Sequence, residues 1–360
     1  MGKVSNMGMD EFEMPVAYLV LYRTDNADAF DEIPIEANSQ FDIGRDHVRR
    51  SLDLNEPTIS SHHLRFHCVM YGDEDTDDVP PLVYVRLLSS NSTPLTQTSV
   101  TGGNSTYLLT KGHPDVLLNH GDKIQLSQHV FVQFSAAFES DYRLDPVQYA
   151  EVKAFTQQYT VTSRKLGAGG YASVYLAVIS NSKRQVACKI VKLPEKPSSG
   201  KHAAALRSTA AAQEFVAEQA RQRKKCQDFR REFEILKRLD HPNIIRLEKA
   251  YYASKHIYIM QELITGGDLL SYLENKQGIE EPECAVIIYQ LLKAVEYLHN
   301  QNIVHRDIKP ENILMTSWRE GTRIVLTDFG QARTLEDAKR DAQSVFRMQS
   351  LVGTLGYAAP

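Results

Sequence analysis

Cysteine is scarce in this sequence: Cys68, Cys188, Cys226 and Cys284 are the four cysteines among 360 residues. They lie far apart, without the short paired spacing of a zinc site or a disulfide framework, so we expect a reducing compartment. Long apolar runs are also missing. No run approaches the roughly 20 residues that cross a bilayer, and the polar start of the chain lacks a signal-peptide core. The sequence therefore predicts a soluble intracellular protein with no membrane partner.

A strong charge of either sign is missing too. The formal net charge of -4 argues against a protein that contacts nucleic acid directly. The length of 360 residues and the hydrophobic fraction of 42% are enough for more than one core, so we expect two domains.

Short β-type runs separated by polar turns follow a polar tail at residues 1–14. The runs are 16–22, 64–70, 82–88, 106–109, 123–126 and 129–134. Helical periodicity is absent from this part of the chain. We therefore predict an all-β sandwich over residues 15–140.

Three turn motifs occur within this sandwich. They are Gly44-Arg45, Ser60-Ser61-His62-His63 and Asn119-His120-Gly121-Asp122. In this order they resemble a forkhead-associated (FHA) domain, a β-sandwich whose loops bind phosphothreonine peptides. Arg45 can form charge-assisted hydrogen bonds with a phosphate, and the Ser60 hydroxyl can donate another, with Ser61 beside it. His63 is expected to brace the loop.

The FHA resemblance also implies an asparagine that holds the peptide backbone. Asn91 and Asn104 each precede Ser-Thr where the family usually has Gly-Thr. Asn91 follows a strand as the family residue does, whereas Asn104 lies at the better distance from Gly121-Asp122, so both remain candidates. We interpret the stretch between them as a loop insertion. A sandwich that packs without binding phosphate is the alternative.

A mixed-charge segment at 141–158 is expected to be a linker. Beyond it, His305-Arg306-Asp307-Ile308-Lys309-Pro310-Glu311-Asn312 and Asp328-Phe329-Gly330 resemble the catalytic loop and metal-binding turn of a eukaryotic protein kinase. The resemblance implies an α+β bilobal domain at 159–360, with an amino lobe at 159–264 and a partial carboxyl lobe at 265–360. It also implies Asp307 as the proton acceptor, Lys309 beside the transferred phosphate, and Asn312 and Asp328 as Mg²⁺ ligands.

The same resemblance implies an ATP site in the amino lobe. Lys189 would position the phosphates, with Glu232 as its helix-borne ion-pair partner. Gln261 would be the gatekeeper. The other expected contacts are those of the glycine-rich loop, the hinge backbone and the ribose: Leu166, Gly167, Gly169, Val174, Glu262, Ile264 and Asp268.

Two positions near the carboxyl end are expected to regulate activity. Ser350 stands three residues after Arg347, and we predict that a second copy of the enzyme phosphorylates it, so that the phosphate pairs with Arg306. An unmodified loop serine is the alternative. Thr354 would link the catalytic residues to the substrate platform.

The helix expected at 283–299 carries Ile288, Leu291, Leu292, Val295 and Leu298 at helical spacing, and these are predicted to be core. The chain stops at Pro360, one residue short of the kinase Ala-Pro-Glu anchor. We therefore interpret the sequence as truncated, and we expect this helix to expose an apolar stripe.

An FHA domain followed by a Ser/Thr kinase resembles the checkpoint effector kinases, including a meiosis-specific fungal branch. The resemblance implies a nuclear enzyme that binds a phosphothreonine-containing protein, can dimerise for trans-phosphorylation, and modifies Ser/Thr protein substrates. A phosphopeptide-binding scaffold with an inactive kinase lobe is the alternative, and an FHA-linked kinase outside checkpoint signalling is a third.

Overall fold

The structure is a computed structural model. It describes residues 14–24, 26–52, 55–71, 79–98, 104–137, 143–169, 172–193, 217, 231–319 and 321–334. The chain divides into two compact units, one formed by residues 1–70 and 81–140 and the other including 141–360. Among the residues that the structure describes, no helix is both long and apolar enough to cross a membrane.

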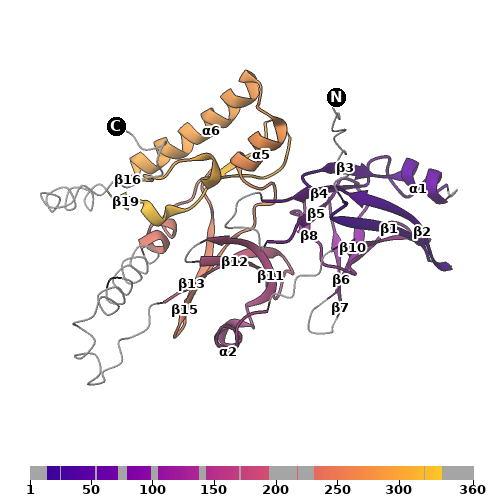
Figure 1. Ribbon diagram of the computed structural model, residues 1–360, viewed down its shortest axis with the longest axis horizontal. Coiled ribbons are helices and arrows are strands. Elements are labelled where there is room, and N and C mark those ends of the chain that lie inside the picture. Colours follow the sequence, from indigo (N-terminus) through magenta and orange to yellow (C-terminus); the bar gives the residue numbers. More distant parts are fainter. Residues whose placement is uncertain are drawn as a thin grey trace, which may run out of the picture. The chain divides into compact units, whose positions relative to one another are not determined.

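The first unit is built from two antiparallel sheets (Figure 1). The six-stranded sheet has the order β2-β1-β10-β9-β6-β7, and the four-stranded sheet has the order β3-β4-β5-β8. The strands are β1 (Ala17–Arg23), β2 (Asn26–Ile35), β3 (Gln40–Ile43), β4 (Leu64–Val69), β5 (Leu82–Leu87), β6 (Thr93–Thr98), β7 (Asn104–Leu109), β8 (Val116–Leu117), β9 (Lys123–Gln125) and β10 (Val130–Ala136).

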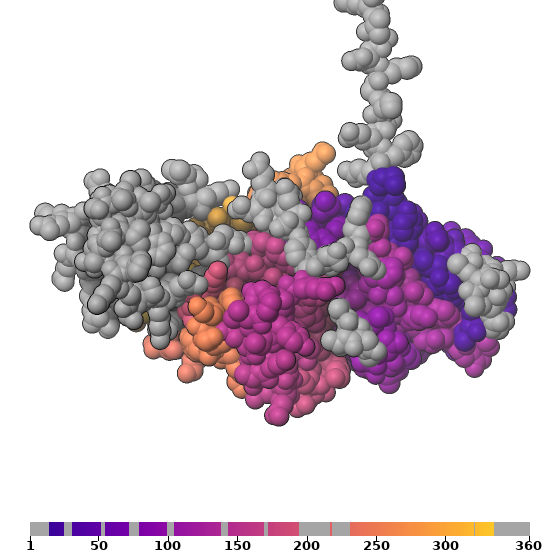
Figure 2. Space-filling model, turned by 60° about the horizontal axis from the view of Figure 1, so that its bottom comes forward, coloured from indigo at the N-terminus to yellow at the C-terminus, as the bar shows by residue number. Residues whose placement is uncertain are grey.

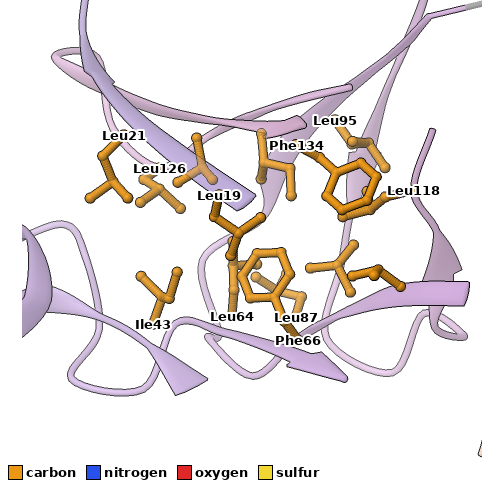
Figure 3. Close-up of a cluster of buried hydrophobic side chains, with 14 of the residues drawn as sticks. Leu19, Leu21, Ile43, Leu64, Phe66, Leu87, Leu95, Leu118, Leu126 and Phe134 are labelled. Carbon is orange, nitrogen blue, oxygen red and sulfur yellow. The ribbon is translucent and has the colours of Figure 1, made fainter. Parts of the chain in front are cut away.

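The core of this unit lies between the two sheets. Figure 3 shows Leu19 and Phe134 from one layer of strands and Leu64 and Phe66 from the other, with their side chains directed into the same space. Leu19 pairs with Phe134 across β1 and β10, and the four side chains are at most 2% exposed. The predicted all-β sandwich is confirmed.

Two details of the first unit differ from the prediction. Residues Arg45–Leu52 form a helix, α1, which is too short and polar for an apolar helical repeat to be read from its sequence; its residue Val48 is fully buried. The stretch between Asn91 and Asn104 is not merely an inserted loop, because β6 and β7 pair along their length from Thr93–Leu109 to Thr98–Asn104. Residues 99–103 lie outside the described part.

The second unit contains a five-stranded antiparallel sheet with the order β11-β12-β13-β15-β14. Its strands are β11 (Tyr159–Gly169), β12 (Ala172–Ile179), β13 (Gln185–Lys192), β14 (Leu247–Tyr252) and β15 (His256–Glu262). After β15 come helices α5 (Leu269–Lys276) and α6 (Glu281–Asn300). Short strands β16 (Ile303–Val304) and β17 (Ile313–Met315) follow, and then β18 (Ile324–Leu326) and β19 (Arg333–Thr334).

The segment expected to be a linker is instead part of the second unit. Pro146–Val152 form helix α2, which begins with a capping box made by Asp145 and Gln148, and a 3₁₀ turn at Lys153–Phe155 follows. Phe155 is buried and stacks on Tyr251 of β14 at 4.3 Å between ring centroids. The end of the segment therefore packs on the five-stranded sheet through these apolar contacts. In Figure 2, α2 and the strands after it form one continuous surface, coloured magenta.

Helix α6 buries only part of its apolar surface. Ile287, Ala294 and Leu298 are buried, whereas Ile288 and Leu292 are 46% and 61% exposed. The prediction that Ile288 and Leu292 are core is therefore wrong, because helical spacing identifies an apolar set but not which member faces a neighbour. The predicted apolar stripe is present, and it also includes Val286 and Tyr289.

Candidate active site and peptide-binding loops

The predicted catalytic loop lies between β16 and β17 and is fixed by its own hydrogen bonds. The Asn312 side-chain nitrogen donates to the Asp307 backbone oxygen at 2.8 Å and to Asp307 Oδ2 at 3.1 Å. His305 Nε2 donates to the Thr327 carbonyl at 3.0 Å, and Asp307 N donates to His305 Nδ1 at 3.3 Å. Burial lowers the pKa of His305, which keeps Nδ1 available as an acceptor. Asp307 and Asn312 are thus held side by side.

Arg306 and Lys309 lie in the same loop, and each has its own local environment. Arg306 adopts a left-handed conformation with a φ of 73°, which places a strained backbone turn next to Asp307. Lys309 lies 3.8 Å from Glu311 Oε1. The side chains of Arg306 and Lys309 are both partly exposed, so a ligand can reach them.

Lys189, Glu232 and Asp328 come together from three separate parts of the chain. Lys189 Nζ, on β13, lies 3.0 Å from Glu232 Oε1 and 3.6 Å from Asp328 Oδ1. Glu232 is 1% exposed and lies in a helical segment at 231–236. Burial works against the Lys189 ammonium, but the carboxylates of Glu232 and Asp328 raise its pKa. The lysine is therefore charged and fixed at a junction of three elements.

Asp328 is held in an unusual backbone conformation. Its φ is 58°, in the left-handed region where Asp is one of the tolerated residues. The Lys189 charge lowers the pKa of its carboxyl, and the Gly330 N–H adds a hydrogen bond. A Cβ at Gly330 would approach Asp328 Oδ1 to 3.3 Å. The turn therefore presents an ionised carboxylate beside Lys189.

The glycine-rich segment forms the end of a hairpin. Gly167 pairs with Val174 and Gly169 with Ala172 across β11 and β12, and Leu166 is buried just before them. A Cβ at Gly167 would come no closer than 4.0 Å to Val174. Residues 170–171, at the tip, lie outside the described residues.

The predicted hinge begins where β15 ends. Gln261, the predicted gatekeeper, is polar and buried, with 8% of its surface exposed. The Glu262 N–H donates to the Arg246 carbonyl at 3.0 Å, and Ile264 packs beside the carboxyl-lobe core. Asp268 caps α5 by accepting from Ser271 N at 2.8 Å. These residues follow one another along the edge between the sheet and the helices.

The residues present fit a nucleotide with a divalent cation. Because the nitrogen of Asn312 is used by Asp307, its amide oxygen is directed elsewhere and can ligate a cation. Amide and carboxylate oxygens are the ligands that Mg²⁺ takes in proteins. With Asp328 as the second oxygen donor, Asn312 and Asp328 would hold Mg²⁺, and Lys189 would meet the phosphates.

In the first unit, the loop after α1 anchors the side chain of Arg45, the first residue of that helix. Its Nε donates to the Ile59 carbonyl at 2.8 Å and Nη2 to the Pro57 carbonyl at 3.2 Å, while its backbone N–H donates to Ser60 O at 2.9 Å. A Cβ at Gly44 would lie 1.8 Å from the Ser61 carbonyl oxygen. Only glycine therefore allows the two loops to approach, and their contact orients the Arg45 guanidinium.

The structure brings Asn91, and not Asn104, to the loop of Ser60. The Asn91 side-chain nitrogen donates to the Thr58 carbonyl at 2.8 Å, and the Ser60 hydroxyl lies 2.8 Å from that of Ser89. Asn104 pairs with Thr98 at the far end of β6. At about 3.3 Å per residue, that end is roughly 17 Å along the strand from Thr93.

Several contributors to these sites escaped prediction from the sequence. Ser89 and Thr93 support the Ser60 loop, Thr93 through a 2.8 Å contact with His63 Nε2. Glu151 anchors α2, and Arg323 contacts the hinge. Among these features, only α2 could have been predicted from the sequence, because Asp145-Pro146-Val147-Gln148 is a capping-box sequence. The predicted regulatory residues Ser350 and Thr354 lie outside the described residues.

Comparison with known proteins defines the class of the second unit. Residues 160–360 match the family described as "Protein kinase domain". This match covers more than half of the 360 residues, and the chain therefore belongs to the protein kinase family.

Individual relatives show which protein kinases the chain resembles. The chain is 34% identical over 304 residues to the meiosis-specific serine/threonine-protein kinase mek1 of Schizosaccharomyces pombe, covering 84% of this chain and 56% of the relative. It is 33% identical over 350 residues to the meiosis-specific serine/threonine-protein kinase MEK1 of Saccharomyces cerevisiae, covering 91% and 60%.

A third relative is the serine/threonine-protein kinase cds1 of Schizosaccharomyces pombe, which is 28% identical over 326 residues, covering 90% and 61%. The chain thus spans between 56% and 61% of the length of these three relatives. All three matches extend across both units, and they confirm the family resemblance drawn from the motifs.

Proposed function

We propose that this chain is part of an ATP-dependent Ser/Thr protein kinase that is recruited to phosphothreonine through its FHA domain. The observation that carries the proposal is the meeting of Lys189, Glu232 and Asp328 within 3.6 Å, beside a catalytic loop in which Asn312 holds Asp307. These residues are far apart in sequence, and the fold brings their charged groups into one site.

The side chains divide the chemistry between them. Bound ATP would supply the phosphoryl group, and Mg²⁺ would neutralise the charge on its oxygens. Asp307 accepts the proton of a substrate serine or threonine hydroxyl, and Lys309 neutralises charge on the transferred group. Glu232 keeps Lys189 extended toward the phosphates. The protein therefore promotes the reaction by positioning the reacting groups and by stabilising their charge.

The first unit supplies recruitment. Arg45, Ser60 and Asn91 offer a guanidinium, a hydroxyl and an amide from loops joined by hydrogen bonds, which suits a phosphate and the adjoining peptide backbone. Ser61 lies exposed in the same loop and can add a contact. The partner is a phosphothreonine-containing protein.

The relatives direct the proposal toward a pathway. Two carry "meiosis-specific" in their names, so we infer a role in meiotic or DNA-damage checkpoint signalling in the nucleus. Dimerisation would allow one copy to phosphorylate Ser350 of another, with Arg306 pairing the new phosphate and Thr354 linking the segment to Asp307.

The test is phosphoryl transfer from ATP to serine and threonine peptides, comparing the full-length protein with its Asp328→Ala variant. We expect transfer only by the wild type and only with Mg²⁺. Binding of a phosphothreonine peptide, measured in parallel, should be equal in both proteins. Peptide binding without any Asp328-dependent transfer would refute the kinase proposal and leave a phosphopeptide-binding scaffold.

A further inference from the structure

Arg323 joins three segments behind the proposed nucleotide site. Its Nη2 donates to Glu262 Oε2 at 2.9 Å, and its Nη1 donates to the Pro242 carbonyl at 2.7 Å. The backbone oxygen of Arg323 accepts from Thr316 N at 3.1 Å. The side chain of Arg323 therefore connects the hinge with the loop before β14, and its backbone fixes the residue within the β17–β18 turn.

The hinge residue is held from both sides. Glu262 Oε1 accepts from the Arg246 N–H at 2.9 Å, while Oε2 accepts from Arg323. The Glu262 side chain is 18% exposed and that of Arg323 is 38% exposed. The carboxylate is thus bound at once by the residues that directly precede β14 and β18.

Arg323 also directly precedes the strand that leads to the proposed metal-binding turn. β18 runs from Ile324 to Leu326, and Asp328 follows two residues later. Leu326 N donates to the Asn243 carbonyl at 2.9 Å, and Ile245 N donates to Leu326 O at 3.0 Å. The strand is therefore held at its far end, and Arg323 fixes its near end to the hinge.

Resting on the proposed kinase function, we propose that Arg323 is a positioning residue that sets the separation between the adenine end and the phosphate end of the nucleotide site. The hinge backbone at Glu262 would hold the adenine, and Asp328 would hold the cation on the phosphates. Because a nucleotide must reach both ends, an error in their separation weakens its binding even when each end is intact.

The fork of the guanidinium is essential to this role. Arg323 uses two nitrogens for two different acceptors, whereas a lysine has one ammonium on a flexible stem. Arg323→Lys should therefore restore part of what Arg323→Gln loses, because it keeps the charge but not the simultaneous contacts with Glu262 and Pro242.

The experiment measures equilibrium binding of Mg²⁺·ATP and of adenosine to the full-length protein. In Arg323→Gln we expect the Kd for Mg²⁺·ATP to rise about three- to tenfold. The Kd for adenosine, which occupies only the hinge end, should stay within about twofold. Arg184→Gln is the matched control: it removes a 2.9 Å ion pair with Glu248 that does not include the hinge, and it should change neither constant.

A double-mutant cycle adds a second readout. Glu262→Gln should also weaken Mg²⁺·ATP binding, and the double variant should bind no more weakly than Arg323→Gln alone, since both substitutions remove the ion pair between Arg323 and Glu262. Unchanged Mg²⁺·ATP binding in Arg323→Gln, or an equal loss for adenosine, would overturn the inference while the kinase proposal stands. A wild-type protein that binds no Mg²⁺·ATP would overturn both.

Discussion

The Asn91 side-chain amide donates to the backbone carbonyl of Thr58 at 2.8 Å. This hydrogen bond joins the loop after β5 to the loop that carries Ser60, and the Asn91 N–H adds a contact to Ser89 Oγ at 3.0 Å. Two Asn-Ser-Thr triplets occur in the sequence, and only this one lies beside the proposed phosphate-binding residues.

Phosphothreonine binding should therefore distinguish the two asparagines. We expect Asn91→Ala to weaken binding of a phosphothreonine peptide about tenfold and Arg45→Ala to weaken it at least tenfold, because charge-assisted hydrogen bonds to an anion are lost. Asn104→Ala should leave binding within about twofold. Isothermal titration calorimetry with matched phosphorylated and unphosphorylated peptides measures this, and a larger loss for Asn104 than for Asn91 would contradict it.

The stability of the first unit should depend on the protonation of His63. The Ser60 N–H donates to its Nδ1 at 3.1 Å, so Nε2 carries the proton toward Thr93. Burial lowers the pKa of His63 to about 4, from an ordinary value of 6.5. The unfolded chain therefore takes up a proton first as the pH falls.

Stability should thus be intact above pH 6.5 and be lost as the pH falls from there through about 4, by roughly 2–3 kcal/mol. Thermal unfolding followed by circular dichroism at several pH values measures the loss. His63→Gln should be less stable at neutral pH and should show a smaller decline over this range. An equal decline in both proteins would assign the effect to other groups.

Glu151 should make a large contribution to the stability of the second unit. Oε1 accepts from Ser254 Oγ and Lys255 N at 2.7 and 2.6 Å, and Oε2 accepts from Tyr258 at 2.9 Å and lies 2.7 Å from His256 Nδ1. Burial raises the pKa of Glu151, but these donors outweigh it and lower the value to about 2.

Glu151→Gln should destabilise the second unit by roughly 2–3 kcal/mol at neutral pH, because an amide nitrogen would face groups that donate. The difference from the wild type should shrink as the pH falls from about 4.5 toward 2, where the wild-type carboxylate is protonated. Trp318 is the single tryptophan of the chain, so its fluorescence during urea unfolding reports on this unit alone. Glu296→Gln, on exposed α6, should unfold like the wild type.

The ion pair of Lys189 should matter for turnover more than for folding. In Glu232→Gln, the lysine loses its 3.0 Å ion pair with Glu232 and keeps the longer one with Asp328, at 3.6 Å, so we expect kcat to fall about 10–100-fold through misplacement of the phosphates. Glu234→Gln is the matched control, since Glu234 is exposed on the same helical segment. Steady-state kinetics should show no change for Glu234, and equal effects of both substitutions would remove the assigned role of Glu232.

Much of the architecture was accessible from the sequence because it is encoded locally. Strands such as β4 and β5 are contiguous runs of β-forming residues, and the catalytic and metal-binding motifs place their polar residues within a few positions of one another. Helix α1 is not predicted because it is short and half of its residues are charged. Helix α2 is not predicted because the composition of 141–158 is typical of a linker, although the Asp145 cap can be read from the sequence.

The sequence by itself determined the order of the two domains, the β character of the first, the kinase family of the second and the residue types at its site. Only the tertiary structure decided that Asn91 rather than Asn104 meets the Ser60 loop, that α2 packs on the kinase sheet, and that Arg323 reaches the hinge. The reason is physical: motifs and periodicity depend on neighbours along the chain, whereas these contacts depend on sheet register and on side chains up to about a hundred residues apart.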